Sequence, residues 1–233
     1  MMSEAYPELR EGGESPSEVL DCRDIEGTVC YCDPEAEAEL RRRIAASGSH
    51  FIKWIDSGDF HYLTRLTTSG IARPYCLVLF DHHPDMQPAA LGGILSCGGW
   101  LRTLLEEDDW LFKAIIIGIN PQLVEETKGF GPRVEVFTEN DLDRELLWPI
   151  GLPAYISIDK DVLSPEFART DWDQGSMTQE RLFSLLKSIF RATRVLGVDI
   201  CGELTGAKGG REDDRRINRQ FNKDIYNFIN NCI

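Results

Sequence analysis

The chain has 233 residues, of which 42% are hydrophobic and 27% are charged, and this length is enough to bury one substantial core. It carries 39 acidic and 25 basic residues, which gives a formal net charge of −14. That charge argues against nucleic acid or an anionic membrane as a partner, and a small cationic substrate would fit it better. The sequence has no apolar run of about 18 residues, which excludes an ordinary membrane-spanning helix, so we expect a cytoplasmic protein.

The first residues differ in composition from the rest of the chain. Residues 1–24 contain many glutamates, Pro7 and Pro16, and few large apolar side chains, which predicts a flexible acidic leader. Residues 25–233 contain no internal repeat and no low-complexity linker, so we predict a single domain there.

Apolar runs and helical patterns alternate along this domain. A β-type run at residues 28–32 is followed by a helical pattern at 34–46 with proline in its first turn. Further β-type runs lie at 51–55, 75–80, 114–119, 134–137, 154–158 and 195–200, and further helical patterns lie at 99–107, 139–147, 178–191 and 212–230. The clearest β-type runs are continuously apolar, so both faces of their sheet must be covered. We therefore predict an α/β fold with three layers, a doubly wound and mostly parallel sheet with helices on both faces.

Two acidic motifs follow apolar runs of the predicted sheet. The sequence DHHPD occupies residues 81–85 after one run, and SIDKD occupies residues 157–161 at the end of another. Ligands bind beyond the carboxyl ends of strands in sheets of this class. If the chain stays extended, alternation places Asp81, His83 and Asp85 on one side, and likewise Asp159 and Asp161, while Lys160 points away.

Carboxylates that converge at one sheet edge repel each other and need a compensating cation. Two divalent ions would balance the four aspartates of these motifs. Oxygen donors with one or two imidazoles suit Mn²⁺, Mg²⁺ or Fe²⁺, and no cysteine lies within either motif, so we predict two divalent ions and prefer manganese. Either motif alone is more often a turn or a helix cap than a metal site. The two motifs together are far more specific for metal binding.

With these two motifs, in this order and at the ends of apolar strands, the chain resembles the ureohydrolases, the family of arginase, agmatinase and formiminoglutamase. Their diagnostic signatures are Asp-x-His-x-Asp and a later Ser-x-Asp-x-Asp. The resemblance covers roughly residues 50–205 and implies an arginase-like fold. Ureohydrolases often assemble as trimers or hexamers, so a homo-oligomer is possible, although no residue marks an interface.

The resemblance also implies a role for each residue of the two motifs. Asp81 and Asp159 would bridge the two ions, Asp85 would complete one position, and His83 with Asp161 would complete the other. One more histidine is required, and the family's Gly-Gly-Asp-His-Ser is absent. The stretch SGDFH at residues 57–61 takes its place, so His61 is the candidate ligand and His50, also upstream of DHHPD, is the competitor.

The implied reaction is hydrolysis of a C–N bond in a guanidino, formimino or related amidine or amide compound by a hydroxide that bridges the ions. Asp161 would relay a proton toward the leaving nitrogen, and Glu203 would bind the substrate's cationic group, although its spacing differs slightly from the family's late glutamate. The family commonly has a second histidine in a His-Gly step, where this chain has SCGG at residues 96–99.

Three other functions remain open at this point. The chain could bind metal without catalysis, because the family's substrate-recognition loops are not readable in its sequence. It could be a manganese-dependent phosphoesterase of the DHH type, since residues 81–83 read DHH, although that family places its Asp-x-Asp before this motif. It could also be a zinc deacetylase relative that holds one ion with Asp81, His83 and Asp159.

Overall fold

The computed structural model describes residues 18–89, 91–142, 151–205 and 210–233. Within these residues the centre is a six-stranded sheet in the order β2-β8-β7-β3-β5-β6, and every neighbouring pair is parallel. The strands are β2 (Ile52–Trp54), β3 (Tyr75–Phe80), β5 (Leu111–Ile119), β6 (Val134–Thr138), β7 (Ala154–Asp159) and β8 (Val195–Cys201).

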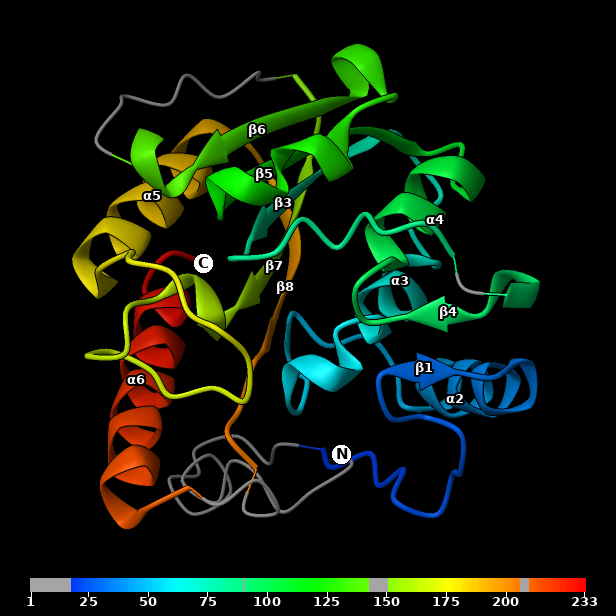
Figure 1. Cartoon of the computed structure of the whole chain (residues 1–233), viewed down its shortest axis with the longest axis horizontal. Helices are drawn as coiled ribbons and strands as arrows, with labels where there is room; N and C mark the ends of the chain where they lie inside the picture. Colours follow the sequence, from blue (N-terminus) through cyan, green and yellow to red (C-terminus); the bar gives the residue numbers. More distant parts are fainter. Residues whose placement is uncertain (1–17, 90, 143–150, 206–209) are drawn as a thin grey trace.

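Helices cover both faces of this sheet, which confirms the predicted three-layer α/β fold (Figure 1). One face packs against α2 (Pro34–Ala46), α3 (Leu63–Thr68) and α4 (Trp100–Glu107), and the other packs against α5 (Gln179–Ala192) and α6 (Glu212–Asn230). The alternation of β3 shows why both layers are needed. Leu77 and Leu79 enter one core and Val78 and Phe80 enter the other, and all are buried. Among the described helices, none combines the length and apolarity needed to cross a bilayer.

Local signals in the sequence fix the helix boundaries. The Asp33 side chain caps α2 by accepting a hydrogen bond from the Ala36 N–H at 2.8 Å, with Pro34 in the first turn. The Thr178 hydroxyl caps α5 in the same way through the Arg181 N–H. The helix predicted at 139–147 is seen only as a 3₁₀ turn at Glu139–Asp141, and residues 143–150 lie outside the described residues.

The strand predicted at residues 28–32 is wrong in length. Only β1 (Tyr31–Cys32) is extended, and it pairs antiparallel with β4 (Leu95–Ser96) in a small separate sheet. Cys30 adopts a φ of 58°, which ends any regular strand there. Of the predicted leader, residues 1–17 lie outside the described residues. The following part contacts the domain, since Cys22 is buried and the Arg43 guanidinium pairs with Asp24.

The strand order determines where a ligand site can form. From β3 the chain moves to β5 and β6 on one side, then returns to place β7 and β8 on the other side of β3. The sheet therefore has its topological switch point between β3 and β7, and a crevice forms beyond the carboxyl ends of two strands at such a point. DHHPD follows β3 and SIDKD ends β7, so both motifs lie at this crevice.

Candidate metal centre

The segment after β3 turns its side chains into the crevice. The His83 N–H donates to Asp81 Oδ1 at 2.7 Å, which folds the backbone back over the first aspartate. Asp85 has a φ of 51°, so the extended conformation that we expected for residues 81–85 is not kept. The Asp85 carboxylate is instead held by the indole N–H of Trp100 at the start of α4. Asp81, His83 and Asp85 still reach the same site, through turns and not through strand alternation.

The segment after β7 also turns sharply. β7 ends at Asp159, and a 3₁₀ turn (Lys160–Val162) begins with the Asp161 N–H donating to Asp159 Oδ1 at 3.0 Å. Asp161 then reaches across to the β3 segment, where its Oδ1 accepts a hydrogen bond from the His82 N–H at 3.0 Å. Both aspartates are buried, at 3% and 2% exposure. The two motifs are thus linked directly at the switch point.

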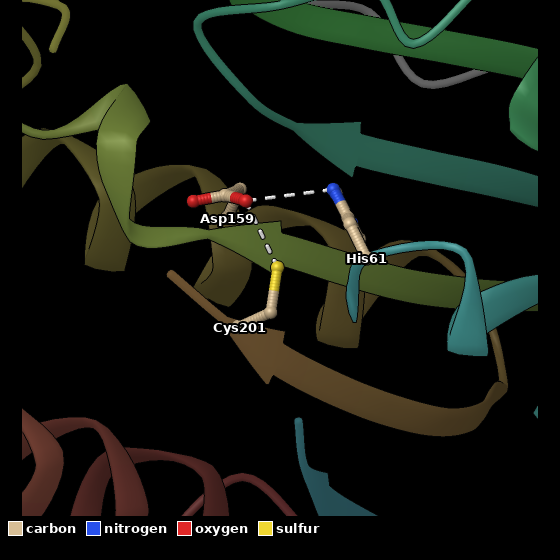
Figure 2. Close-up of side chains that lie close together, drawn as sticks. All are labelled: His61, Asp159 and Cys201. Atoms are coloured by element: carbon tan, nitrogen blue, oxygen red, sulfur yellow. Dashed lines mark hydrogen bonds and ion pairs between the residues drawn. The ribbon is translucent and has the colours of Figure 1, made fainter. Parts of the chain in front are cut away.

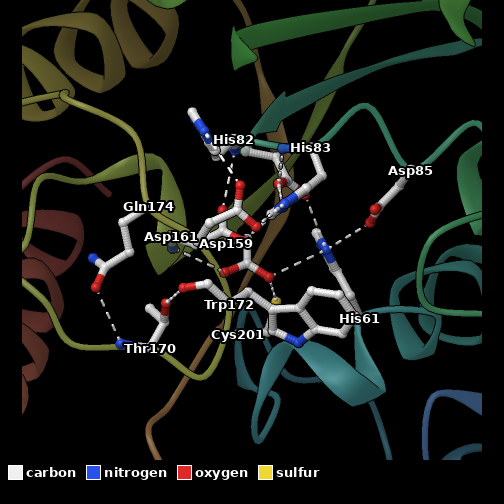
Figure 3. A network of polar contacts seen from close by, with 12 residues as sticks. His61, His82, His83, Asp85, Asp159, Asp161, Thr170, Trp172, Gln174 and Cys201 are labelled. Carbon is white, nitrogen blue, oxygen red and sulfur yellow. Dashed lines mark hydrogen bonds and ion pairs between the residues drawn. The ribbon is translucent and has the colours of Figure 1, made fainter. Parts of the chain in front are cut away.

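His61 lies at the centre of one group of potential ligands, which we call the His61 position. Its Nδ1 is 2.9 Å from Asp85 Oδ2, 3.2 Å from Asp81 Oδ2 and 3.5 Å from Asp159 Oδ2 (Figure 3). His50 lies elsewhere, exposed on the surface and bonded to Glu18. The structure therefore places His61, and not His50, among the aspartates of both motifs.

The other nitrogen of His61 has its own partner, which orients the ring. Nε2 is 2.9 Å from Ser157 Oγ, and that hydroxyl donates to Asp199 Oδ1 at 2.6 Å. Because the serine gives its proton to Asp199, its oxygen accepts the His61 Nε2–H. In the neutral ring, which is the form that binds a metal, this assignment leaves the Nδ1 lone pair directed at the site.

His83 belongs to a second group, the His83 position, with Asp81 and Asp161. Its Nδ1 is 2.9 Å from Asp161 Oδ2 and 3.6 Å from Asp81 Oδ1. Its Nε2 is 3.0 Å from Asp173 Oδ1 on a surface loop. An imidazole held between a metal position and an outer carboxylate is a recurrent arrangement in metalloproteins. Asp81 is shared by the His61 and His83 positions, as a bridging ligand would be.

The residues present fit a pair of divalent cations. Asp81 Oδ2 is a buried carboxylate oxygen without a hydrogen-bond partner, and it lies 3.2 Å from His61 Nδ1. Buried polar atoms without a partner are costly and point to a missing ligand. Asp81, Asp85, Asp159 and Asp161 are each at most 6% exposed, and four such carboxylates cannot all be ionised in one site without cations. Each potential ligand atom in these groups lies within 4.8 Å of the others in its group.

The titration behaviour of the metal-free site follows from this crowding. Burial raises the pKa of Asp161 from 3.8 to about 6, with the charge of Asp81 adding to the effect and His83 opposing it. Burial likewise raises the pKa of Asp85 and Asp159. Burial alone would lower the pKa values of His61 and His83, but the surrounding anionic groups outweigh it and raise both. Protons are therefore retained where cations would bind, and a metal ion would replace them.

Comparison with known proteins decides the family. A sequence model of the arginase family matches residues 8–204. The chain belongs to the arginase family. An uncharacterized protein from Thermotoga maritima is 32% identical over 193 residues, which cover 82% of this chain and 72% of that protein. The resemblance inferred from DHHPD and SIDKD is thus confirmed.

Solved structures of the arginase fold show the same architecture. A hypothetical agmatinase from Burkholderia thailandensis superposes with a TM-score of 0.62 at 19% identity, covering 83% of this chain and 64% of the agmatinase. A formiminoglutamase from Trypanosoma cruzi, determined with Mn²⁺, gives a TM-score of 0.62 at 15% identity, covering 84% of this chain and 70% of the other. This arginase-family chain spans about 64% of the agmatinase's length.

Glu203 is held by polar groups of the chain itself in this arginase-family site. It is 8% exposed, and its Oε1 accepts a hydrogen bond from Asn218 Nδ2 at 2.7 Å. Its Oε2 pairs with the fully buried Lys160 ammonium and accepts from Asn222 Nδ2. Both carboxylate oxygens are thus engaged between the β7 turn and α6. Its binding of a substrate cation stays a prediction, and these contacts do not supply evidence for it.

Sequence reasoning missed Cys201, because no cysteine lies within either motif. In the structure its Sγ is 2.9 Å from Asp159 Oδ2. The usable signal was its place at the carboxyl end of β8, next to β7 in a parallel sheet. Asp173 contacts His83 from a loop.

The Asp173 carboxylate, which contacts His83 from outside the metal position, can be removed by substitution. Asp173→Asn is expected to weaken divalent-metal binding at the His83 position by roughly 10–100-fold, because an outer partner of a ligating histidine holds its tautomer and orientation. Isothermal titration calorimetry with Mn²⁺ measures this. Asp109→Asn, another exposed aspartate, is the control and should bind as wild type. Equal affinities for all three proteins would show that Asp173 does not support the site.

The raised pKa of Asp161 predicts how the metal-free chain responds to pH. Between 3.8 and about 6 the folded state holds a proton that the unfolded state releases, so the unfolding free energy falls as pH rises through this window. The loss of unfolding free energy is at most about 3 kcal/mol. The pKa values of Asp161 in the unfolded and folded states differ by about 2 units, and each pKa unit corresponds to about 1.4 kcal/mol. The pKa values of His61 and His83 are also raised, so both side chains stay protonated in this pH window and do not offset the loss of stability.

Urea unfolding in EDTA, at steps between pH 4 and pH 7, measures this slope. Asp161→Asn is expected to remove most of it. With Mn²⁺ present the slope should reverse, because metal ions compete with protons for the same carboxylates. A metal-free wild type whose stability increases with pH across this window would contradict the account.

Proposed function

We propose that the chain is a hydrolase with a binuclear divalent-metal centre that cleaves a C–N bond in an amidine-type small molecule, such as a guanidino or formimino compound. The observation that supports this best is the convergence of His61, His83 and four buried aspartates at the switch point, with Asp81 shared between two metal positions. Membership of the arginase family and the fold shared with agmatinase and formiminoglutamase structures support the reaction class.

The donor atoms support manganese at the His83 position. Asp81, His83 and Asp161 offer carboxylate oxygens and one imidazole nitrogen, a set that suits Mn²⁺ better than a thiophilic metal. A related formiminoglutamase structure contains Mn²⁺. Two divalent ions held this close would lower the pKa of a shared water and polarise the carbon that is attacked. Asp81 and Asp159 are the proposed bridging ligands.

Residues of the chain would control the proton during the reaction. Asp161 has a pKa of about 6 in the metal-free chain, and we propose that its carboxylate passes a proton to the leaving nitrogen. His83 joins Asp161 to Asp173, whose side chain is 70% exposed.

The exposed edge of the site suggests how substrate approaches. Trp172 is 40% exposed, and its ring lies edge-on to His83 at 5.9 Å between centroids. Its indole N–H donates to Asp59 Oδ1 at 3.1 Å, which holds it beside the metal positions. An aromatic face next to the Asp173 carboxylate suits a small planar cation. We propose that the substrate's cationic group is bound here, since the Glu203 carboxylate is engaged elsewhere.

One observation favours the non-catalytic alternative, in which the protein binds metal without turnover. The Glu203 carboxylate is tied to Lys160 and α6, so the charged group that the family resemblance assigns to substrate is held by the chain itself. Cytoplasmic location and assembly into a homo-oligomer remain proposals beside either function.

The test of catalysis is release of urea or ammonia from a panel of guanidino and formimino compounds by Mn²⁺-loaded protein. Activity is expected with at least one compound, abolished by EDTA and strongly reduced in Asp161→Asn. Asp109→Asn should match wild type. If metal-loaded protein binds the compounds in calorimetry but releases no product from any of them, the non-catalytic alternative replaces the proposed hydrolase.

A further inference from the structure

Cys201 stands apart from the other cysteines because polar groups surround its sulfur. It is fully buried at the end of β8, and its Sγ is 2.9 Å from Asp159 Oδ2 (Figure 2). His61, Asp159 and Cys201 each offer one ligand atom, and these three atoms lie within 4.8 Å of one another. Cys76, by contrast, is buried at the opposite, amino end of the sheet, away from both metal positions.

The backbone brings this thiol to the site and leaves it little freedom. Asp159 and Cys201 are register partners across β7 and β8. The next residue, Gly202, has a φ of 84°, and a Cβ there would lie 2.2 Å from Asp159 Oδ1. Only glycine allows the end of β8 to pass so close to the aspartate. The Gly202 N–H donates to the Asp56 carbonyl at 3.1 Å, which fixes this approach.

We propose that Cys201 supplies a thiolate ligand to the His61 position, and that this position therefore selects a thiophilic ion, zinc first, while the His83 position takes manganese. This inference rests on the proposed binuclear centre and specifies its metals. A thiolate ligand favours zinc over manganese, whereas a site with only carboxylate and imidazole ligands can hold manganese. On binding, the Cys201 S–H bond breaks, the proton leaves to buffer, and a sulfur–metal bond replaces the hydrogen bond to Asp159.

The separations between donor atoms agree with this ligand set. A sulfur at about 2.3 Å and oxygen or nitrogen atoms at about 2.0–2.2 Å from one zinc ion lie roughly 3.3–3.7 Å from each other in tetrahedral geometry. Cys201 Sγ to Asp159 Oδ2 is 2.9 Å, and Asp159 Oδ2 to His61 Nδ1 is 3.5 Å. A small adjustment of these side chains therefore suffices. The competing explanation is that the thiol only positions Asp159 through its hydrogen bond.

Cobalt spectroscopy distinguishes the two explanations. Chelator-stripped protein loaded with Co²⁺ is expected to show a sulfur-to-cobalt charge-transfer band in the near ultraviolet, because only thiolate ligation produces it. Cys201→Ser should lose the band, and Cys76→Ser, the same change at the other end of the sheet, should keep it. Equimolar Zn²⁺ and Mn²⁺ should yield one of each per wild-type chain, and a lower bound Zn²⁺:Mn²⁺ ratio in Cys201→Ser.

One measurement needs no variant and covers the case in which Cys201→Ser fails to fold. X-ray absorption at the zinc edge of the loaded wild type should show a sulfur neighbour at about 2.3 Å. Zinc bound with only oxygen and nitrogen neighbours, or a cobalt spectrum without charge transfer, overturns the thiolate ligand while leaving the binuclear centre intact. Failure of any divalent ion to bind would instead refute the proposed function itself.

Discussion

Asp159→Asn is expected to abolish high-affinity binding of both metal ions and all hydrolytic activity. Asp159 is a proposed bridging ligand: it is 3.5 Å from His61 Nδ1, and it accepts hydrogen bonds from the Cys201 thiol and from the N–H of Asp161, a residue of the His83 position. The amide has nearly the same shape as the carboxylate but removes one negative charge from a buried site. The loss should exceed the roughly 10–100-fold expected for an outer hydrogen-bond partner.

Calorimetry with Mn²⁺ and elemental analysis after dialysis measure this loss. Asp85→Asn is the graded comparison, because Asp85 contacts only the His61 position, and it should lose one ion and keep the other. Asp108→Asn is the control for removing a structural carboxylate, since Asp108 bonds Tyr75 at the opposite edge of the sheet. Retention of both ions in Asp159→Asn would show that this aspartate is a turn residue and not a bridging ligand.

Glu203→Gln is expected to destabilise the fold by about 3–5 kcal/mol, because it leaves the buried Lys160 charge without its carboxylate partner. Lys160 is completely buried between two proposed metal ligands, so the damage should extend to metal affinity. If Glu203 instead serves mainly to bind the substrate's cation, the substitution would raise KM and leave the unfolding free energy close to that of wild type.

Urea denaturation of metal-loaded protein, paired with steady-state kinetics, separates these roles. The double variant Lys160→Met with Glu203→Gln removes both charges and should recover much of the stability lost in Glu203→Gln, since the uncompensated charge is gone. Lack of recovery would show that the hydrogen bonds from Asn218 and Asn222, and not the ion pair, account for the role of Glu203.

The fold was predictable because its signals are local and repeated. The runs that became β3 and β7 are apolar on both faces, and this requires a sheet covered by helices on two sides. Asp33 with Pro34, and Thr178, mark helix starts with side chains that cap the first turn. The strand at residues 28–32 failed because the positive φ of Cys30 interrupts a run whose composition still favours a strand.

The candidate site was predictable in its residue types but not in its geometry. Strand alternation grouped Asp81, His83 and Asp85 correctly, yet the structure achieves this with turns, including the positive φ of Asp85. The order of the strands along the sequence does not show which strand ends become neighbours in the sheet. For this reason the structure was needed to show two contacts of the site. Cys201 reaches Asp159 only through the pairing of β7 with β8, and Asp173 reaches His83 from a loop.

We propose that this arginase-family chain holds two divalent metal ions at the switch point of its sheet. The most direct test is the metal content of protein purified without chelator from a culture supplied with manganese and zinc, measured by elemental analysis against protein concentration. About two divalent ions per chain are expected, reduced to about one in Asp85→Asn and to none in Asp159→Asn. Wild-type protein that carries no stoichiometric metal, and takes up none on titration with Mn²⁺ or Zn²⁺, would contradict the proposal.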